Sequence, residues 1–288
     1  MFVTRLISGI ILLVIAICTM SLGNIWLIAP LCLISLVAYR ELTKALGCAG
    51  EKKGFNALEI VGFLGIAAYY TAVWLVAIEH KGFVLLLACV MYVFMAQMLV
   101  YVVTFPRFHA NQVLGAFFSF VYAPVMLAFV FLTREMGSGQ YGEIGFYVVW
   151  LILISSWGCD TCAYAVGVLI GKHKIFPALS PKKSLEGCIG GVAGAALIGG
   201  LYGRFVVERA LNGGGNEEAV AAGALALICA LGAVMSMVGD LAASAIKRNN
   251  NIKDYGKLIP GHGGIMDRFD SVIVTAPMTY FLAVLLLG

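Results

Sequence analysis

Residues 240–270 read DLAASAIKRNNNIKDYGKLIPGHGGIMDRFD, and they hold four aspartates, three lysines, two arginines and a histidine. Apolar runs flank this stretch at residues 218–246 and 270–287. A charged loop between two such runs lies at a membrane surface, where ionisable groups are costly and usually serve a function. The stretch therefore indicates a membrane protein whose functional centre is this loop.

The composition of the whole chain supports the same class. Of its 288 residues, 61% are hydrophobic and 12% are charged, and the mean hydropathy is +0.97. A soluble domain usually carries about 25% charged residues. The alternating segments of about ten residues that mark a transmembrane barrel do not occur. We therefore expect an all-α, polytopic integral membrane protein.

About nine apolar runs are long enough to cross a bilayer, which takes roughly 20 residues. These runs are residues 5–22, 25–46, 57–79, 82–104, 112–133, 143–170, 187–209, 218–246 and 270–287. The first run is expected to be a retained span, because no small-residue cleavage site follows it. We expect residues 1–142 to form a membrane scaffold and residues 143–288 to form the catalytic domain with its loop at 244–270. The many glycines of the seventh run predict close helix packing.

The lysines and arginines are distributed unevenly between the two sides of the membrane that this count defines. One side holds 15 of the 19, and the other holds only Lys81, Arg134, Arg204 and Arg209. Positive charge collects in cytoplasmic loops. The N-terminus and the charged loops, with the active site, are therefore expected to be cytoplasmic. The net charge of +4 has no separate soluble domain to carry it, so nucleic acid is not an expected partner.

The acidic residues of the loop suggest a metal site. Asp240, Ser244 and Lys247 are spaced to share one helix face, and Asp267 and Asp270 are spaced to share another. If the two helix ends meet, three carboxylates gather beside a hydroxyl, which suits Mg²⁺. The alternative is a set of ion pairs, such as Asp267 with Lys247, that ties the loop to the helix.

The middle of the loop suggests a phosphate clamp. Residues 260–264 read PGHGG, and glycines there allow backbone N–H groups to face an anion. His262 is a candidate general base, or it hydrogen-bonds a phosphate or the loop itself. Several residues of the loop would hold phosphate oxygens. They are Lys247, Arg248, Lys253, Lys257, Arg268, Gly263 and Gly264.

A second basic cluster lies in residues 171–174, GKHK, and 180–187, SPKKSLEG. A polybasic loop beside a membrane usually binds anionic headgroups of membrane lipids. A Ser-Pro turn before a helix is also typical of an anion site. Asp160 in the preceding run is either a structural partner or part of a cavity. Together the clusters favour a cavity for Mg²⁺ and phosphates, open to lipid, and hence phosphoryl or nucleotidyl transfer onto a lipid.

The loop closely resembles the signature of the phosphatidate cytidylyltransferases, also called CDP-diacylglycerol synthases. The matching residues are Ser244, Ile246, Lys247, Arg248, Lys253, Asp254, Pro260, Gly261, His262, Gly263, Gly264, Asp267, Arg268 and Asp270. The segment at 180–187 is similar to the second motif of that family, with Ser184 where threonine is frequent, and Asp160 with Gly171-Lys172 fits its preceding span. The resemblance is sharp over residues 158–270 and carries no functional residue from 1–150.

The resemblance implies that CTP and phosphatidate react to give CDP-diacylglycerol and pyrophosphate. It implies Mg²⁺ on Asp240, Asp267 and Asp270, with K⁺ as a possible second ion. Lys247 and Arg268 would neutralise phosphate oxygens, and Ser244 would complete the ion shell or hold a phosphate. The implied nucleotide-holding residues are Asp160, Lys172, Ser180, Lys182 and Lys183. A homodimer in a bacterial inner membrane is also implied.

Two other functions remain open from the residues alone. A CTP-dependent kinase of a lipid alcohol would use the same ion and basic clamps but would release CDP. An ion- or proton-coupled transporter would use Asp160 and Asp240 as relay carboxylates. Transporters usually place such groups at the membrane midplane between internal repeats, and here the ionisable residues crowd one edge.

Overall fold

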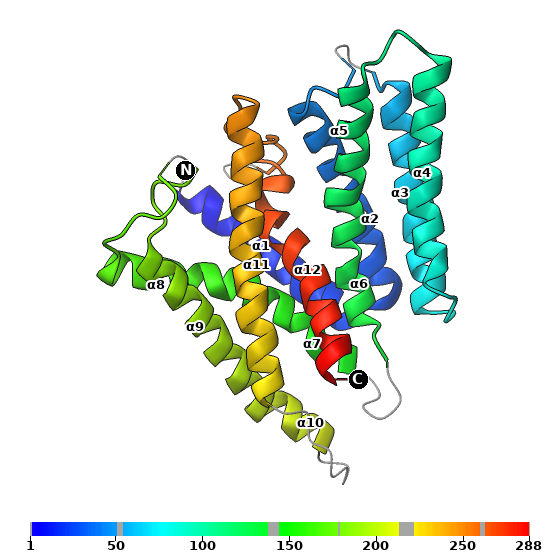
Figure 1. The fold of residues 1–288 in the computed structure, drawn as a ribbon. Coiled ribbons are helices and arrows are strands. Elements are labelled where there is room, and N and C mark those ends of the chain that lie inside the picture. The colour runs from blue at the N-terminus through cyan, green and yellow to red at the C-terminus, as the bar shows by residue number, and fades with distance from the viewer. Residues whose placement is uncertain are drawn as a thin grey trace. The chain divides into compact units, whose positions relative to one another are not determined.

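The computed structural model describes residues 2–50, 54–137, 144–177, 179–212, 222–259 and 263–287, with side chains from Gly9 onward. Within these ranges the chain is helical and contains no β-strand (Figure 1). The helices are α1 (Phe2–Leu22), α2 (Asn24–Ala45), α3 (Ala57–Ala77), α4 (Val84–Val103), α5 (Ala110–Phe120), α6 (Phe129–Arg134), α7 (Ile144–Leu153), α8 (Cys159–Ile170), α9 (Leu185–Tyr202), α10 (Glu208–Asn212), α11 (Ala222–Asn249) and α12 (Met266–Leu287).

Eight helical segments of the described chain are long and apolar enough to cross a membrane. They are Asn24–Ala45, Ala57–Ala77, Val84–Val103, Ala110–Arg134, Ile144–Ile170, Leu185–Leu211, Ala222–Asn249 and Met266–Leu287. A shorter apolar helix, Gly9–Leu22, precedes them within α1. The predicted all-α, polytopic membrane architecture is therefore confirmed, and the chain is an integral membrane protein.

Three of these segments contain a π-helical turn, at Val121–Val125, Ile154–Gly158 and Gly203–Val207. Turns of this kind interrupt the regular α-helical hydrogen bonding and often occur at functional sites. The turn at Ile154–Gly158 ends two residues before Asp160, the acidic residue of the sixth predicted span. The helix backbone is thus irregular just before the turn of α8 that carries the Asp160 carboxylate.

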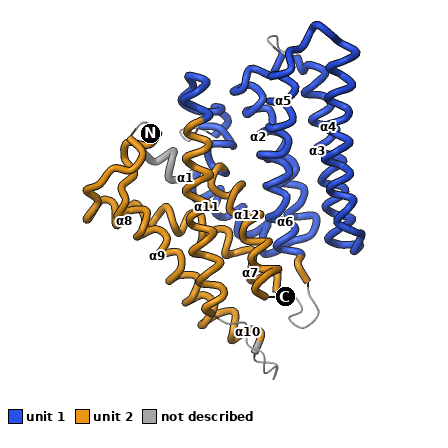
Figure 2. Tube along the Cα trace, viewed as in Figure 1, with its two compact units in different colours: residues 1–135, 246–269 blue, residues 136–245, 270–288 orange. Residues whose placement is uncertain are grey.

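The chain divides into two compact units (Figure 2). Unit 1 comprises residues 1–135 and 246–269, and unit 2 comprises residues 136–245 and 270–288. The signature loop therefore belongs mainly to unit 1. The functional division expected between residues 142 and 143 is a different kind of boundary and stays a prediction.

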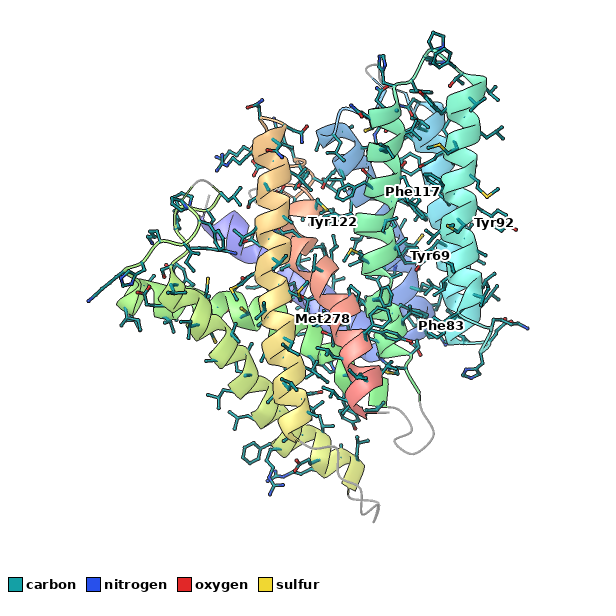
Figure 3. All side chains as sticks on the ribbon, in the orientation of Figure 1. Tyr69, Phe83, Tyr92, Phe117, Tyr122 and Met278 are labelled. Carbon is teal, nitrogen blue, oxygen red and sulfur yellow. The ribbon has the colours of Figure 1, made fainter. Side chains whose placement is uncertain are left out.

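Unit 1 has an aromatic core between α2, α3 and α5. Tyr69 lies edge-on to Phe120 with ring centroids 6.0 Å apart, and both side chains are buried. The Ser35 and Tyr70 hydroxyls form a buried hydrogen bond of 2.6 Å. Tyr92 on α4 points away from the unit and is 68% exposed, as expected for a lipid-facing side chain (Figure 3).

Unit 2 is organised around the close approach of α8 and α9, which lie side by side (Figure 1). A Cβ atom added to Gly190 would lie 2.5 Å from the Val166 side chain, and one added to Gly194 would lie 2.5 Å from Cys162 Sγ. Glycine is needed at these positions because any side chain would overlap α8. The close helix packing predicted from the glycines is confirmed.

Candidate functional site

Unit 2 contains a cavity of about 450 Å³ between α8, the segment that precedes α9, and α11. Its wall combines two kinds of side chain. The apolar part is formed mainly by Tyr164, Val168 and Met237. The charged lining residues are Asp160, Lys174, Lys182 and Lys183. The lining of the cavity therefore combines three lysines with an apolar surface.

The segment that carries the lysines is fixed by the start of α9. Ser184 is the N-cap, and its Oγ accepts a hydrogen bond of 3.2 Å from Gly187 N–H. The Glu186 carboxylate accepts the backbone N–H of His173 and contacts its Nδ1 at 2.5 Å. Lys174 Nζ donates to the Lys182 carbonyl oxygen at 3.0 Å. These contacts hold the basic segment against the first turn of the helix.

Lys183 forms an ion pair with Asp240 of α11. The side chains are 20% and 33% exposed, so the pair is partly shielded from water. Asp160 lies within electrostatic range of both groups. In water-poor surroundings such charges interact more strongly than on an open surface. The structure thus brings Asp160, Lys183 and Asp240 together, although they are far apart in sequence.

The signature loop in unit 1 is folded around Asp267, whose side chain is 4% exposed. Lys247 Nζ donates to its Oδ1 at 2.7 Å. The backbone N–H groups of Tyr255 and Gly264 donate to its Oδ2 at 2.9 and 3.0 Å. The ion pair between Asp267 and Lys247, considered above as an alternative to metal binding, is therefore present.

The glycine-rich part of the loop has a conformation that requires glycine. Gly263 has a φ of +88°, a backbone conformation that residues with a Cβ atom rarely adopt. Its carbonyl oxygen accepts a 3.0 Å hydrogen bond from Ile259 N–H, which closes the loop. Residues 260–262 lie outside the described residues. The predicted role of His262 therefore stays a prediction.

The other predicted residues are dispersed. Arg248, Lys253 and Arg268 are exposed, and Ser244 is half-buried in α11. Lys172 and Ser180 belong to the basic segment but do not line the cavity. The Lys172 backbone N–H instead donates to Glu186, at 3.1 Å. Only part of the predicted nucleotide-binding set therefore shares one cavity.

No group of three histidine, cysteine, aspartate or glutamate side chains in the described part of the chain is close enough to hold a metal ion. Mg²⁺, however, usually takes one or two carboxylates and completes its shell with water and substrate phosphates. In unit 2, a Cβ atom on Gly239 would lie 2.7 Å from the Asp270 carbonyl oxygen. The helices that carry Asp240 and Asp270 thus approach closely, and Mg²⁺ binding by their carboxylates stays a prediction.

Three polar residues that line the cavity were not among the predicted nucleotide-holding residues: Lys174, Tyr164 and Ser184. Lys174 lies in the motif at 171–174 and Ser184 lies in the motif at 180–187. The same motifs that indicated Lys172, Lys182 and Lys183 therefore also pointed to these two residues. Tyr164 follows Asp160 by four residues, one helical turn, so it shares the face of α8 that carries the carboxylate. That spacing was the available signal.

The model of the cytidylyltransferase family matches residues 3–286 of the chain. The chain belongs to the cytidylyltransferase family. Membership confirms the resemblance drawn from the loop at 244–270. The matched region also includes the N-terminal helices, from which the resemblance carried no functional residue.

Several relatives in this family carry the name phosphatidate cytidylyltransferase. The one from Thermotoga maritima is 38% identical over 148 residues, which is 51% of this chain and 53% of the relative. The one from Staphylococcus haemolyticus is 35% identical over 178 residues, 62% of each chain. The one from Bacillus subtilis is 36% identical over 146 residues, 51% of this chain and 49% of the relative. The matches thus span about half to three-fifths of these relatives.

Proposed function

We propose that this cytidylyltransferase family member transfers the cytidylyl group of CTP to phosphatidate, giving CDP-diacylglycerol and pyrophosphate. The observation that carries the proposal is the cavity of unit 2, where Lys174, Lys182 and Lys183 adjoin an apolar wall. Cationic groups suit phosphates, and an apolar wall suits a ligand that is partly lipid. The relatives named phosphatidate cytidylyltransferase support the same choice of substrates.

The reaction exchanges one phosphorus–oxygen bond for another. A phosphate oxygen of phosphatidate forms a bond to the α-phosphorus of CTP, while the bond from that phosphorus to the bridging oxygen of the β-phosphate breaks. Pyrophosphate takes the electron pair of the broken bond. The attacking phosphate is already anionic, so no side chain must remove a proton from it. The protein contributes positioning and charge neutralisation.

The lysines of the cavity are suited to that task. Lys183 is positioned by Asp240, and Lys174 is positioned by its hydrogen bond to the basic segment. Fixed cationic groups need little reorganisation as negative charge shifts to the leaving pyrophosphate. Lys182 and Asp160 line the same cavity and would bind the nucleotide.

The signature loop supplies the second set of groups. Lys247 and Arg268 would neutralise phosphate oxygens, and Ser244 would hold a phosphate or an ion. Asp240, Asp267 and Asp270 are the proposed Mg²⁺ ligands, and K⁺ is a possible additional ion. Bound Mg²⁺ would neutralise phosphate charge and orient the phosphates.

The distribution of basic residues supports an orientation in which the N-terminus and the active site face the cytoplasm. Bacterial relatives support placement in an inner membrane. A homodimer formed through membrane helices is part of the same proposal.

The proposal is tested with the purified full-length chain in detergent, given phosphatidate, Mg²⁺ and CTP labelled at the α-phosphate. We expect label in the lipid and an equal amount of released pyrophosphate. Transfer of a γ-label to an added lipid alcohol, with CDP released, would show a lipid kinase instead. Well-folded protein that is inactive in both assays but moves a solute into proteoliposomes without nucleotide would show a transporter.

A further inference from the structure

The carboxylate of Glu41 lies at the N-terminus of α12, although the residue belongs to α2. Its Oε1 accepts the Ile265 N–H at 3.1 Å, and its Oε2 accepts the Met266 N–H at 2.8 Å. The residue is buried, with 7% of its surface exposed. Glu41 and the residues it contacts all belong to unit 1.

These contacts supply hydrogen-bond acceptors at the N-terminus of α12, where the local sequence provides no capping side chain. The first N–H groups of a helix have no partner inside the helix, and a polar side chain at the N-cap usually accepts one of them. Ile265, the residue before α12, has no acceptor in its side chain. A carboxylate at this end also interacts favourably with the helix dipole. Glu41 therefore supplies the cap from 224 residues away.

The loop is shaped to receive this carboxylate. A Cβ atom added to Gly264 would lie 2.5 Å from Glu41 Oε2, and one added to Gly256 would overlap its Oε1. Glycine at both positions lets the backbone approach the carboxylate closely. The two glycines lie on either side of the loop residues 257–263. The backbone at Gly256 and Gly264 thus lies against the Glu41 carboxylate.

Glu41 and Asp267 together bind the backbone N–H groups that lead into α12. Asp267 accepts the N–H groups of Tyr255 and Gly264, and Glu41 accepts those of the next two residues, Ile265 and Met266. Three consecutive N–H groups are therefore bound by two carboxylates. Asp267 directly follows Met266, so a shift of the Met266 backbone moves the Asp267 side chain.

We propose that Glu41 is a positioning residue for the signature loop: it fixes the start of α12 and thereby the place of Asp267. The inference rests on the proposed cytidylyl transfer for its kinetic consequence. Its structural part concerns only the Glu41 carboxylate and the loop backbone.

The test uses the full-length chain with Glu41→Gln, which keeps the shape and leaves one acceptor oxygen. We expect backbone amide exchange at Ile265 and Met266 to become about tenfold faster. We also expect kcat for cytidylyl transfer to fall roughly ten- to a hundredfold, while the KM for CTP changes less than about threefold, because the lysine cavity is untouched.

Glu59→Gln is the control, and it also removes the ion pair of Glu59 with Arg40. Glu59 is also buried in unit 1, and its Oε2 accepts two backbone N–H groups, those of Gly50 and Asn56, each at 3.1 Å. Its replacement is expected to speed exchange at Asn56 and to leave Ile265 and Met266 unchanged. Unchanged exchange at Ile265 and Met266 in Glu41→Gln would overturn the proposal. Faster exchange at Ile265 and Met266 with an unaltered kcat would show that Glu41 caps α12 but does not position Asp267 for the reaction.

A second variant tests the same proposal if Glu41→Gln does not fold. Gly256→Ala displaces the carboxylate from the loop side and is expected to lower kcat in the same way. Gly54→Ala is its control, because a Cβ atom there would meet nothing within 4 Å. A wild-type chain without cytidylyl transfer would refute the proposed function, and the exchange measurement would still decide whether Glu41 holds the loop.

Discussion

Lys183 of the basic segment and Asp240 of α11 form an ion pair inside unit 2. Sequence motifs that were considered separately, one as a nucleotide site and one as a metal site, therefore meet through these two side chains. Breaking a shielded pair by removing one partner leaves the other charge uncompensated. Substitutions in this pair should consequently affect both ligand binding and stability.

Lys183→Gln is expected to raise the KM for CTP about tenfold, since a hydrogen bond to a charged group contributes about 1.5–3 kcal/mol. Steady-state kinetics with varied CTP measures this change. Lys182→Gln is the comparison, because Lys182 is exposed and forms no ion pair with a described carboxylate; we expect a rise of less than about threefold. An unchanged KM in both variants would mean that the two lysines bind lipid headgroups instead.

Asp267→Asn is expected to lower kcat at least about a hundredfold, because the charge that binds Lys247 and the proposed ion is lost. The asparagine carbonyl oxygen can still accept the backbone N–H of Tyr255 or Gly264. The fold should therefore persist, which size-exclusion chromatography and circular dichroism will show. Glu79→Gln, at an exposed turn position before α4, serves as the control. Full activity of Asp267→Asn in Mg²⁺ would contradict the metal assignment.

Gly190→Ala is expected to destabilise the protein by about 1–3 kcal/mol, the usual cost of overpacking. The added methyl group would lie 2.5 Å from the side chain of Val166, which has little rotameric freedom. Thermal unfolding in detergent measures the loss. Gly223→Ala on α11 is the matched control, because a Cβ atom there meets nothing within 4 Å. A melting temperature equal to that of the wild type in Gly190→Ala would show that α8 and α9 do not pack this closely.

Burial raises the pKa of the Cys48 thiol to about 11, and the negative charge of Glu59 adds to this effect. At pH 8 only about one thiol in a thousand would be ionised, so we expect very slow maleimide labelling of Cys48. Unfolded protein in SDS should label at once. Rapid labelling of the native chain at pH 8 would contradict this.

The same shift predicts a dependence of stability on pH. The folded state binds the Cys48 proton more tightly than the unfolded state does. The contribution is therefore complete below pH 9 and is lost as the pH rises toward 11. Cys48→Ala should show a smaller fall in stability over this window than the wild type does. If the stabilities of the two proteins fell equally with pH, the raised pKa of Cys48 would not be the cause of the fall.

The membrane helices could be predicted because a run of apolar residues is a local signal. The same holds for Asp240, Ser244 and Lys247 in α11 and for Asp267 and Asp270 in α12, which lie in the expected helices. Spacing within one helix depends only on the helix itself.

The ion pair of Asp267 with Lys247 was named from the sequence as one alternative and is present, but the other partners of these residues depend on tertiary contacts and could not be predicted. The position of Lys183 against Asp240 depends on how the basic segment is fixed to α9, and the position of Glu41 against Met266 joins segments 225 residues apart. Nothing in the neighbourhood of Glu41 marks it, because an acidic residue near the end of an apolar helix is commonly a surface residue. Only the burial of its carboxylate against N–H groups reveals its role.

The long separation between Glu41 and α12 also affects how the protein is made. The ribosome delivers Glu41 to the membrane long before Ile265 and Met266 have been synthesised. Until then its carboxylate lacks the N–H partners that it has in the complete structure, and a polar group without partners is costly in apolar surroundings. We therefore expect the signature loop to assemble last, after translation of α12. Chains truncated before residue 265 should be preferred targets of membrane proteases.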